Sequence, residues 1–238
     1  MPLKSEARIF GVKIDRLSWA ELDEFCRKSL LEDSPNHIVT ANGEILLRAH
    51  DNKSYRDLLN SAELVITDST NVSWVLALKG KPTSVTQGAD LVNHLARIAT
   101  ETRSSIFLLG AKDGIALKAG DKLKKMNPGL RIAGTSSTNP DEVHTIKQIK
   151  DSGADIVLVA YGAPKQEEWI ATHRNELGAK ILVGIGGTFD MLAGVTPRAP
   201  YLLRALRLEW LWRLLLQPTR IGRIWRAVVI FPMKALIK

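Results

Sequence analysis

The regular alternation of short apolar runs with longer stretches of helical periodicity restricts the fold of this chain more than any other feature of its sequence. In the longer stretches, apolar residues recur at spacings of three and four, as they do on one face of a helix. Alternating strands and helices favour a parallel sheet with helices on both faces. The predicted strands cover His37–Thr40, Leu64–Thr67, Ser105–Leu109, Leu130–Ala133, Ile156–Ala160 and Lys180–Val183.

These runs are mostly apolar along their whole length, which indicates strands that are buried on both sides. We therefore expect an α/β fold in two parts. Residues 1–197 are predicted to form a Rossmann-like domain around a mostly parallel sheet, and residues 198–238 a basic helical appendage. The first helix has a clear start signal, because Ser18 and Glu21 have the spacing of a capping box before an amphipathic stretch.

The residues that follow each apolar run are the candidates for a binding site, because ligands of such sheets bind beyond the carboxyl ends of the strands. Glycine turns at these positions expose backbone N–H groups to a phosphate at the start of a helix. Five strand ends carry glycines and polar residues of this kind: Thr40 and Asn42, Asp68, Gly110, Gly162 with Gln166, and Gly186. The sequence therefore predicts one site along this edge.

Structural roles are open for several of these residues. Thr40 and Asn42 are suited to capping the helix that follows them, and Asp68 is suited to an N-cap as well as to catalysis. The glycine turns could equally be tight turns with no ligand. The sequence alone leaves both interpretations standing for each residue.

The stretch after Pro164 reads as the first turn of a helix. Gln166 has a position suited to pointing into the cleft, whereas Lys165, Glu167 and Glu168 are expected on a solvated helix face.

Several chemistries lack their motifs in this sequence. There is no His-Glu-x-x-His pairing for zinc and no Asp-x-Asp pair of the kind that commonly binds the metal of a nucleotide sugar. The absence of Gly-x-Gly-x-x-Gly disfavours NAD, and there is neither a Gly-x-Ser-x-Gly elbow nor a Walker loop. Cys26, the one cysteine, lies in the first predicted helix and is expected to be a packed or surface thiol. We expect neither a metal nor a cofactor.

The positive charge of the chain is concentrated at its C-terminus. The formal net charge is +8, and residues 201–238 hold eight Lys and Arg residues against Glu209 alone. Helices are predicted over residues 198–216 and Thr219–Phe231, and the second places Arg220, Arg223 and Arg226 on one side, opposite apolar residues that include Trp225. Such a helix is typical of one that lies on an anionic membrane.

Two other roles for the C-terminal helices stay open. They could dock on the body with their arginines in water, or the arginines could cover the site and bind phosphate, for which a guanidinium is well shaped. Because the body is nearly neutral, we expect no nucleic-acid partner.

No segment of the sequence has the roughly 18 uncharged apolar residues that a membrane span requires. The N-terminus is charged where a signal peptide would be apolar. We expect a cytoplasmic protein that is peripheral on the cytoplasmic face of the plasma membrane.

Several of these segments together resemble the WecG/TagA/CpsF family of glycosyltransferases, and the resemblance spans nearly the whole chain. The segments that carry it are Thr40-Ala41-Asn42, Thr67-Asp68, Gly162–Ile170, Gly184–Asp190, Arg198-Ala199-Pro200, Glu209–Arg213 and Pro218-Thr219-Arg220.

The resemblance implies an inverting, metal-independent transfer of a sugar from a UDP-sugar to the sugar of an undecaprenyl-diphosphate lipid, in cell-wall or exopolysaccharide synthesis. N-acetylmannosamine, its uronic acid and a related hexose are all open as the sugar. The resemblance places the catalytic base at Asp68, a substrate-binding pair at Thr40 and Asn42, and a functional glutamine at Gln166. It also implies small homo-oligomers.

We further expect Arg213, Arg220 and Arg223 to meet the charge of the leaving group, because no metal would do so. Two departures from the family pattern are visible. Ser69 stands where glycine is expected after the aspartate, and the segment Ser84–Leu91 lacks the family's arginine and has one residue more. Two alternative functions are a non-enzymatic module that binds anionic membranes and a nucleotide-sugar transferase whose acceptor is not a lipid.

Overall fold

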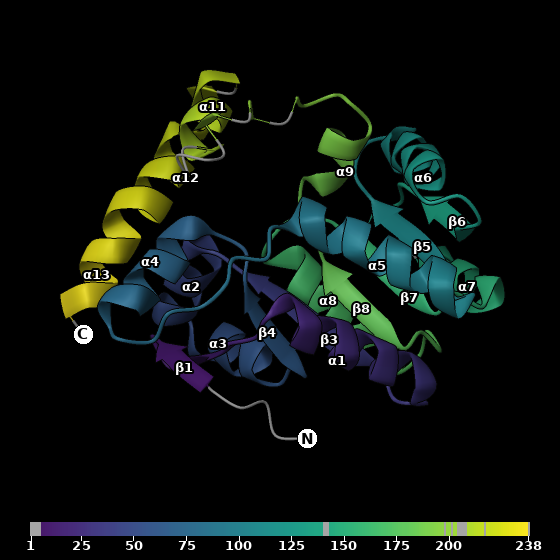
Figure 1. Ribbon diagram of the computed structural model, residues 1–238, viewed down its shortest axis with the longest axis horizontal. Coiled ribbons are helices and arrows are strands. Elements are labelled where there is room, and N and C mark those ends of the chain that lie inside the picture. Colours follow the sequence, from purple (N-terminus) through teal and green to yellow (C-terminus); the bar gives the residue numbers. More distant parts are fainter. Residues whose placement is uncertain are drawn as a thin grey trace.

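A six-stranded parallel sheet forms the centre of the protein in the computed structural model, which describes residues 6–139, 143–197, 199–200, 202–203, 209–216 and 218–237 (Figure 1). The strand order is β4-β3-β8-β7-β5-β6, and every pairing is parallel. The strands are β3 (Asn36–Ala41), β4 (Leu64–Thr67), β5 (Ser105–Gly110), β6 (Arg131–Ser136), β7 (Ile156–Ala160) and β8 (Ile181–Gly184). The structure therefore confirms the predicted α/β fold; the bounds of β4 and β7 are as predicted, and the other four strands differ by one to three residues at an end.

Helices cover both faces of this sheet. Successive side chains of a strand point to opposite faces, so Ile156 and Leu158 pack under one layer of helices, and Val157 and Val159 under the other. The first layer holds α1 (Trp19–Leu31), α5 (Gly88–Thr102) and α6 (Ile115–Met126). The second layer holds α2 (Gly43–Asp51), α3 (Lys53–Asn60), α7 (Val143–Ser152) and α8 (Lys165–His173), and α4 (Thr70–Leu78) packs beside α2 and α3.

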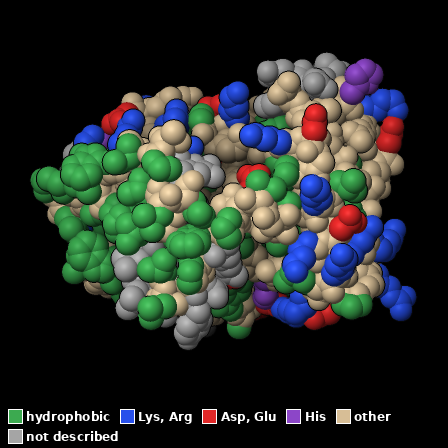
Figure 2. Space-filling model, turned by 90° about the horizontal axis from the view of Figure 1, so that it is seen from above, with side chains coloured by type: hydrophobic (Ala, Val, Ile, Leu, Met, Phe, Trp, Pro, Cys, Tyr) green, Lys and Arg blue, Asp and Glu red, His purple; other side chains and the backbone are tan. Residues whose placement is uncertain are grey.

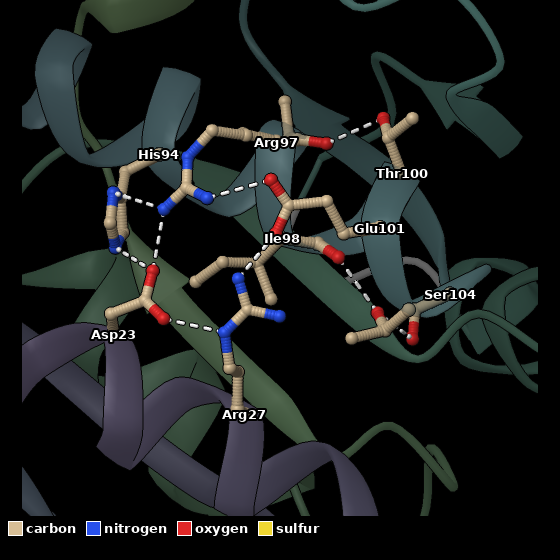
Figure 3. Close-up of polar contacts among 10 residues, drawn as sticks. Asp23, Arg27, His94, Arg97, Ile98, Thr100, Glu101 and Ser104 are labelled. Atoms are coloured by element: carbon tan, nitrogen blue, oxygen red, sulfur yellow. Dashed lines mark hydrogen bonds and ion pairs between the residues drawn. The ribbon is translucent and has the colours of Figure 1, made fainter.

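A network of ion pairs joins α1 to α5 (Figure 3). The Asp23 carboxylate accepts hydrogen bonds from Arg27 Nε at 2.5 Å and from Arg97 at 2.5 Å, and Glu101 on α5 bonds to both arginines. Although burial alone would raise the pKa of Asp23, these two arginines hold it below its usual range. The network fixes α5 against α1, as the capping box of Ser18 and Glu21 fixes the start of α1.

An antiparallel hairpin, β1 (Glu6–Ile9) and β2 (Val12–Asp15), lies outside the main sheet and was not predicted. Its apolar residues alternate with charged ones, and Ala7, Ile9, Val12 and Ile14 are all buried. This period of two is the pattern of a half-buried strand, so the sequence did contain the signal.

The C-terminal helices form a column along one side of the molecule, beside α2 and α4 (Figure 1). They are α11 (Glu209–Leu216), a 3-10 turn over Pro218–Arg220, α12 (Ile221–Trp225), a π-helical turn over Arg226–Ile230 and α13 (Phe231–Ile237). The predicted stop at Phe231 is wrong. Pro232 cannot donate a backbone hydrogen bond and would clash with the preceding turn of an α-helix, and the wider π turn directly before it lets the helix continue.

The column docks on the body through a small apolar contact. Phe231 and Ala235 are buried in the cluster that α2 and α4 share, and the Asn71 side chain donates to the backbone oxygen of Ala227. Gly43 makes room for this approach, since a Cβ there would lie 3.0 Å from the Ala227 oxygen. Of the predicted helix over residues 198–216, α11 covers the second half, and most of residues 198–208 lie outside the described residues.

Candidate active site

A cleft of about 700 Å³ opens at the carboxyl edge of the sheet. Strands β3 and β8 are neighbours there, but the chain leaves β3 toward β4 on one side and enters β8 from β7 on the other. A crevice opens at such a reversal of strand order. The loops after β3, β4, β7 and β8 form its walls, and Ile224 and Val228 of the C-terminal column close it.

Asp68 lies in this cleft, directly after β4. Its backbone N–H donates to the Ala41 oxygen at 2.9 Å, which continues the ladder with β3. Its Oδ1 accepts a hydrogen bond of 2.8 Å from the N–H of Gly88, the first residue of α5. The N-cap of α4 is Ser69, so Asp68 does not cap the helix that follows it. The start of another helix holds this carboxylate, where the helix dipole favours negative charge.

Thr40 and Asn42 also line the cleft, and both already make structural hydrogen bonds. Thr40 donates its hydroxyl to the Gly184 oxygen at 2.8 Å, which joins β3 to the end of β8. Asn42 caps α2, because its Oδ1 accepts from the N–H groups of Glu44 and Ile45 at 3.0 and 3.1 Å. The capping interpretation is thus confirmed for Asn42, and substrate binding by the pair stays a prediction.

Gln166 lines the cleft but is only 3% exposed. Its Oε1 accepts from the backbone N–H of Gly162 at 3.1 Å and of Gly186 at 3.0 Å, so one amide ties together the turns after β7 and β8. Gly162 and Gly186 both line the cleft with left-handed φ values of 75° and 53°, which glycine adopts at no steric cost.

The prediction that Glu167 is solvated is wrong, since it is 1% exposed. The first turn of α8 packs against α3, where the Tyr55 hydroxyl donates to Glu167 Oε2 at 3.1 Å. Gln166 Nε2 donates to the other oxygen, Oε1, at 2.7 Å. Burial raises the pKa of Glu167 to about 7 in spite of these hydrogen bonds, which favour the charged form.

Gly110 is not among the residues that line the cleft, whereas Ala111 is. A Cβ at Gly110 would lie 3.0 Å from both the Ala160 carbonyl carbon and the Tyr161 ring, so glycine here lets β5 pack against the end of β7. The structure therefore does not place Gly110 in the cleft lining, although the turn after β5 reaches the cleft at Ala111.

Arg223 lines the cleft, and its guanidinium is paired with Glu44 in the first turn of α2. Arg223 Nε lies 3.1 Å from each Glu44 oxygen, and its terminal nitrogen donates to Oε2 at 2.8 Å. The side chains of Arg213 and Arg220 lie outside the described residues. The C-terminal helices thus supply one described arginine to the cleft.

Comparison with known proteins identifies the family of this chain. Residues 7–238 match the Glycosyl transferase WecG/TagA/CpsF family. The chain belongs to this family. Two curated relatives from Staphylococcus aureus, strains MRSA252 and NCTC 8325 / PS 47, are each called N-acetylglucosaminyldiphosphoundecaprenol N-acetyl-beta-D-mannosaminyltransferase. Each is 34% identical to this chain over 230 residues, which cover 95% of this chain and 90% of the relative. The predicted resemblance is confirmed, and the protein is a glycosyltransferase.

Sequence reasoning missed part of the wall of this glycosyltransferase's cleft. Glu44 forms its ion pair with a residue 179 positions away, which no local pattern reveals. Trp74 on α4 lines the cleft and is 53% exposed. Ser69, which stands where the family pattern has glycine, lines the cleft, and its Oγ is buried with no hydrogen-bond partner among the described residues.

The part of the chain that the structure describes holds no group of three His, Cys, Asp or Glu side chains placed to bind a metal ion. Metal independence stays a prediction. The first residues of four helices, α2, α4, α5 and α9, line the cleft. Asn42 caps α2 and Asp68 accepts from the first N–H of α5, whereas α4 has no side-chain cap, so its N-terminal end is open to an anion. A binding or catalytic role for these groups stays a prediction.

Proposed function

We propose that this glycosyltransferase moves a sugar, N-acetylmannosamine or a related hexose, from a UDP-sugar to the sugar of an undecaprenyl-diphosphate-linked acceptor, with inversion and without a metal. The observation that carries the proposal is the position of Asp68, in a cleft that is lined by the first residues of four helices. The names of the two relatives support the acceptor and the transferred sugar.

In this mechanism, Asp68 takes the proton of the acceptor hydroxyl while the oxygen attacks the anomeric carbon. The bond to UDP breaks on the opposite face of the sugar, which inverts the anomeric configuration. The N-terminal end of α4, which has no side-chain cap, stabilises the negative charge on the departing diphosphate, and Arg223 adds to this. Thr40 and Asn42 orient the sugars by hydrogen bonds.

The acceptor would reach the cleft from a membrane surface. Figure 2 shows hydrophobic side chains gathered on the side of the molecule that carries the C-terminal helices. Large apolar residues are exposed on α4, α12 and α13: Trp74, Leu78, Ile221, Trp225, Met233, Leu236 and Ile237. Trp74 also lines the cleft, so this apolar face adjoins its mouth. We call these seven residues the membrane face.

Within the described residues, no helix is long and apolar enough to cross a membrane. The membrane face therefore supports a peripheral contact, in which Trp side chains lie at the headgroup level. Contact on the cytoplasmic face of the plasma membrane is part of the proposal.

The test is a transfer assay with purified protein, a panel of UDP-sugars and a short-chain polyprenyl diphosphate that carries N-acetylglucosamine. The expected product gains one hexosamine by mass spectrometry, keeps forming in excess EDTA, and has an inverted anomeric centre by NMR. Transfer to soluble sugars at the same rate as to the diphosphate-linked acceptor would contradict a lipid-linked acceptor. Retention of configuration would contradict the role of Asp68.

A further inference from the structure

A continuous chain of buried hydrogen bonds runs from α3 to the floor of the cleft. Tyr55 donates to Glu167 at 3.1 Å, Gln166 donates to Glu167 at 2.7 Å, and the Gln166 oxygen accepts from two backbone N–H groups. Tyr55, Gln166 and Glu167 are 3%, 3% and 1% exposed, so the chain is closed to solvent. None of the transfer steps above uses Tyr55 or Glu167.

The donors and acceptors in this row of hydrogen bonds allow the Gln166 amide only one orientation. Its oxygen has to face the N–H groups of Gly162 and Gly186, because a reversed amide would set its NH₂ group against two other donors. The NH₂ group then needs an acceptor on its other side. Glu167 supplies that acceptor in either charge state, since a protonated carboxyl keeps one carbonyl oxygen.

The backbone of β8 is shaped to let this amide through. A Cβ at Gly184 would lie 2.5 Å from Gln166 Nε2, so no other residue fits there without a shift of the amide. The oxygen of the same Gly184 accepts the hydroxyl of Thr40. The Gln166 amide thus packs against the residue that also holds Thr40, and its oxygen braces both glycine turns of the cleft wall.

We propose that Glu167 and Tyr55 are positioning residues, which fix the Gln166 amide and, through it, the turns at Gly162 and Gly186 that a substrate meets. The inference rests on the proposed function for its substrate, but the geometry it describes can be measured without any substrate. Glu167 touches no substrate in this scheme, and it acts only through Gln166.

The decisive comparison uses two variants of one residue. Glu167→Gln keeps an acceptor for Gln166 and can donate its NH₂ to the Tyr55 oxygen, whereas Glu167→Leu keeps the approximate size and removes the acceptor. Glu168, which is exposed in the same turn, gives the matched control Glu168→Leu. Tyr55→Phe removes one hydrogen bond and leaves the carboxyl in place.

The first measurement is amide hydrogen exchange at Gly162 and Gly186 in the protein without ligand. We expect Glu167→Leu to accelerate both by about tenfold or more, with β3 and β8 still protected, while Glu167→Gln and Glu168→Leu match the parent. Unchanged exchange in Glu167→Leu would overturn the inference. If that variant does not fold, Tyr55→Phe provides the test, and we expect faster exchange at both glycines. Exchange at the parental rate at both would contradict the positioning role.

The second measurement separates KM from kcat in the transfer assay. Misplaced turns should raise the donor KM or lower kcat by about 10- to 100-fold in Glu167→Leu and leave the acceptor KM unchanged. Glu167→Gln should restore parental values. A Glu167→Leu enzyme with parental constants would overturn the proposal. Failure of the parent to use any UDP-sugar would count against the proposed function alone, since the exchange experiment stands without it.

Discussion

The cleft has two kinds of wall, one built by the sheet and one by the C-terminal helices. On the sheet side, Thr40 and Gln166 are under 5% exposed, and both bond to β8 or the turn after it. On the C-terminal side, Ile224 and Val228 are held in place by the buried Phe231 and by the Arg223–Glu44 pair, whose arginine side chain is 57% exposed. The difference indicates that buried hydrogen bonds hold the sheet side of the cleft, while the C-terminal side depends on one buried aromatic residue and an exposed ion pair.

The largest effect should come from the sheet side. Asp68→Asn keeps an oxygen for the Gly88 N–H but removes the base, so we expect kcat to fall by about 10²- to 10⁴-fold with vesicle binding unchanged. Steady-state kinetics and co-sedimentation with anionic vesicles measure the two effects. A folded Asp68→Asn enzyme with near-parental kcat would remove Asp68 from the mechanism.

The next effect concerns the docking of the C-terminal helices. Phe231→Ala empties a fully buried site, and large-to-small changes of this kind cost about 3–5 kcal/mol. We expect residues 221–237 to lose hydrogen-exchange protection while the sheet keeps its own. Met233→Ala, on the exposed side of α13, is the control and should change neither. Equal loss of protection in the sheet would show that both walls unfold together and would break the comparison.

A third, smaller effect is a pH dependence that belongs to the sheet. His37 on β3 is fully buried, and neither ring nitrogen has a hydrogen-bond partner among the described residues. Burial, with the charge of Arg174, lowers the pKa of His37 to about 3. Because the unfolded chain binds this proton near pH 6.5, the stability that neutral His37 gives is complete above pH 6.5 and declines as the pH falls toward 3.

Between pH 7 and pH 5, this His37 contribution should decrease by about 2 kcal/mol. In urea unfolding at the two pH values, the free energy of unfolding of His37→Phe relative to the parent should therefore rise by about 2 kcal/mol as the pH falls from 7 to 5. Glu167 should show the opposite pH dependence, which Glu167→Gln tests. Because the pKa of Glu167 is raised in the folded protein, its contribution to stability is complete below about pH 4.5 and is lost as the pH rises to about 7. Equal pH dependence in His37→Phe and the parent would contradict the assignment.

The smallest effect on stability should come from the ion pair between the two walls. Glu44→Gln and Arg223→Gln should each change the free energy of unfolding by less than about 1 kcal/mol, because exposed pairs contribute little. Their effects on catalysis should differ, since only Arg223 is proposed to meet the donor diphosphate. We expect a raised donor KM in Arg223→Gln alone. Equal donor KM values in both variants would assign Arg223 a purely structural role.

Most of the sheet could be predicted from local pattern. Runs such as Ile156–Ala160 are apolar throughout because both faces of the strand are covered, and that signal is present in the sequence alone. The position of Asp68 and Gln166 at strand ends followed from the same pattern. Apolar and charged residues alternate in β1 and β2, so this hairpin could also have been predicted from local pattern.

What could not be predicted depended on residues far apart in the chain. Glu167 precedes Glu168 and follows Lys165 by two positions, so it was predicted to be solvated, yet Tyr55 and α3 cover it. The three-residue spacing of Arg220, Arg223 and Arg226 indicated one basic face. In the structure, Arg223 and Arg226 lie near acidic partners on the body, Glu44 and Asp51 of α2. Helical spacing gives a face but not the surface that it meets.

The sequence by itself determined the strand–helix alternation, the family and the edge of the sheet where the cleft lies, because each depends on residue types at short spacing. The tertiary structure decided which groups meet there. Gly88 reaches Asp68 from α5, Gln166 braces two turns, and Phe231 seats the C-terminal helices on α2 and α4. Contacts of this kind join elements that are far apart in the sequence. They form only when both layers of helices have packed on the sheet.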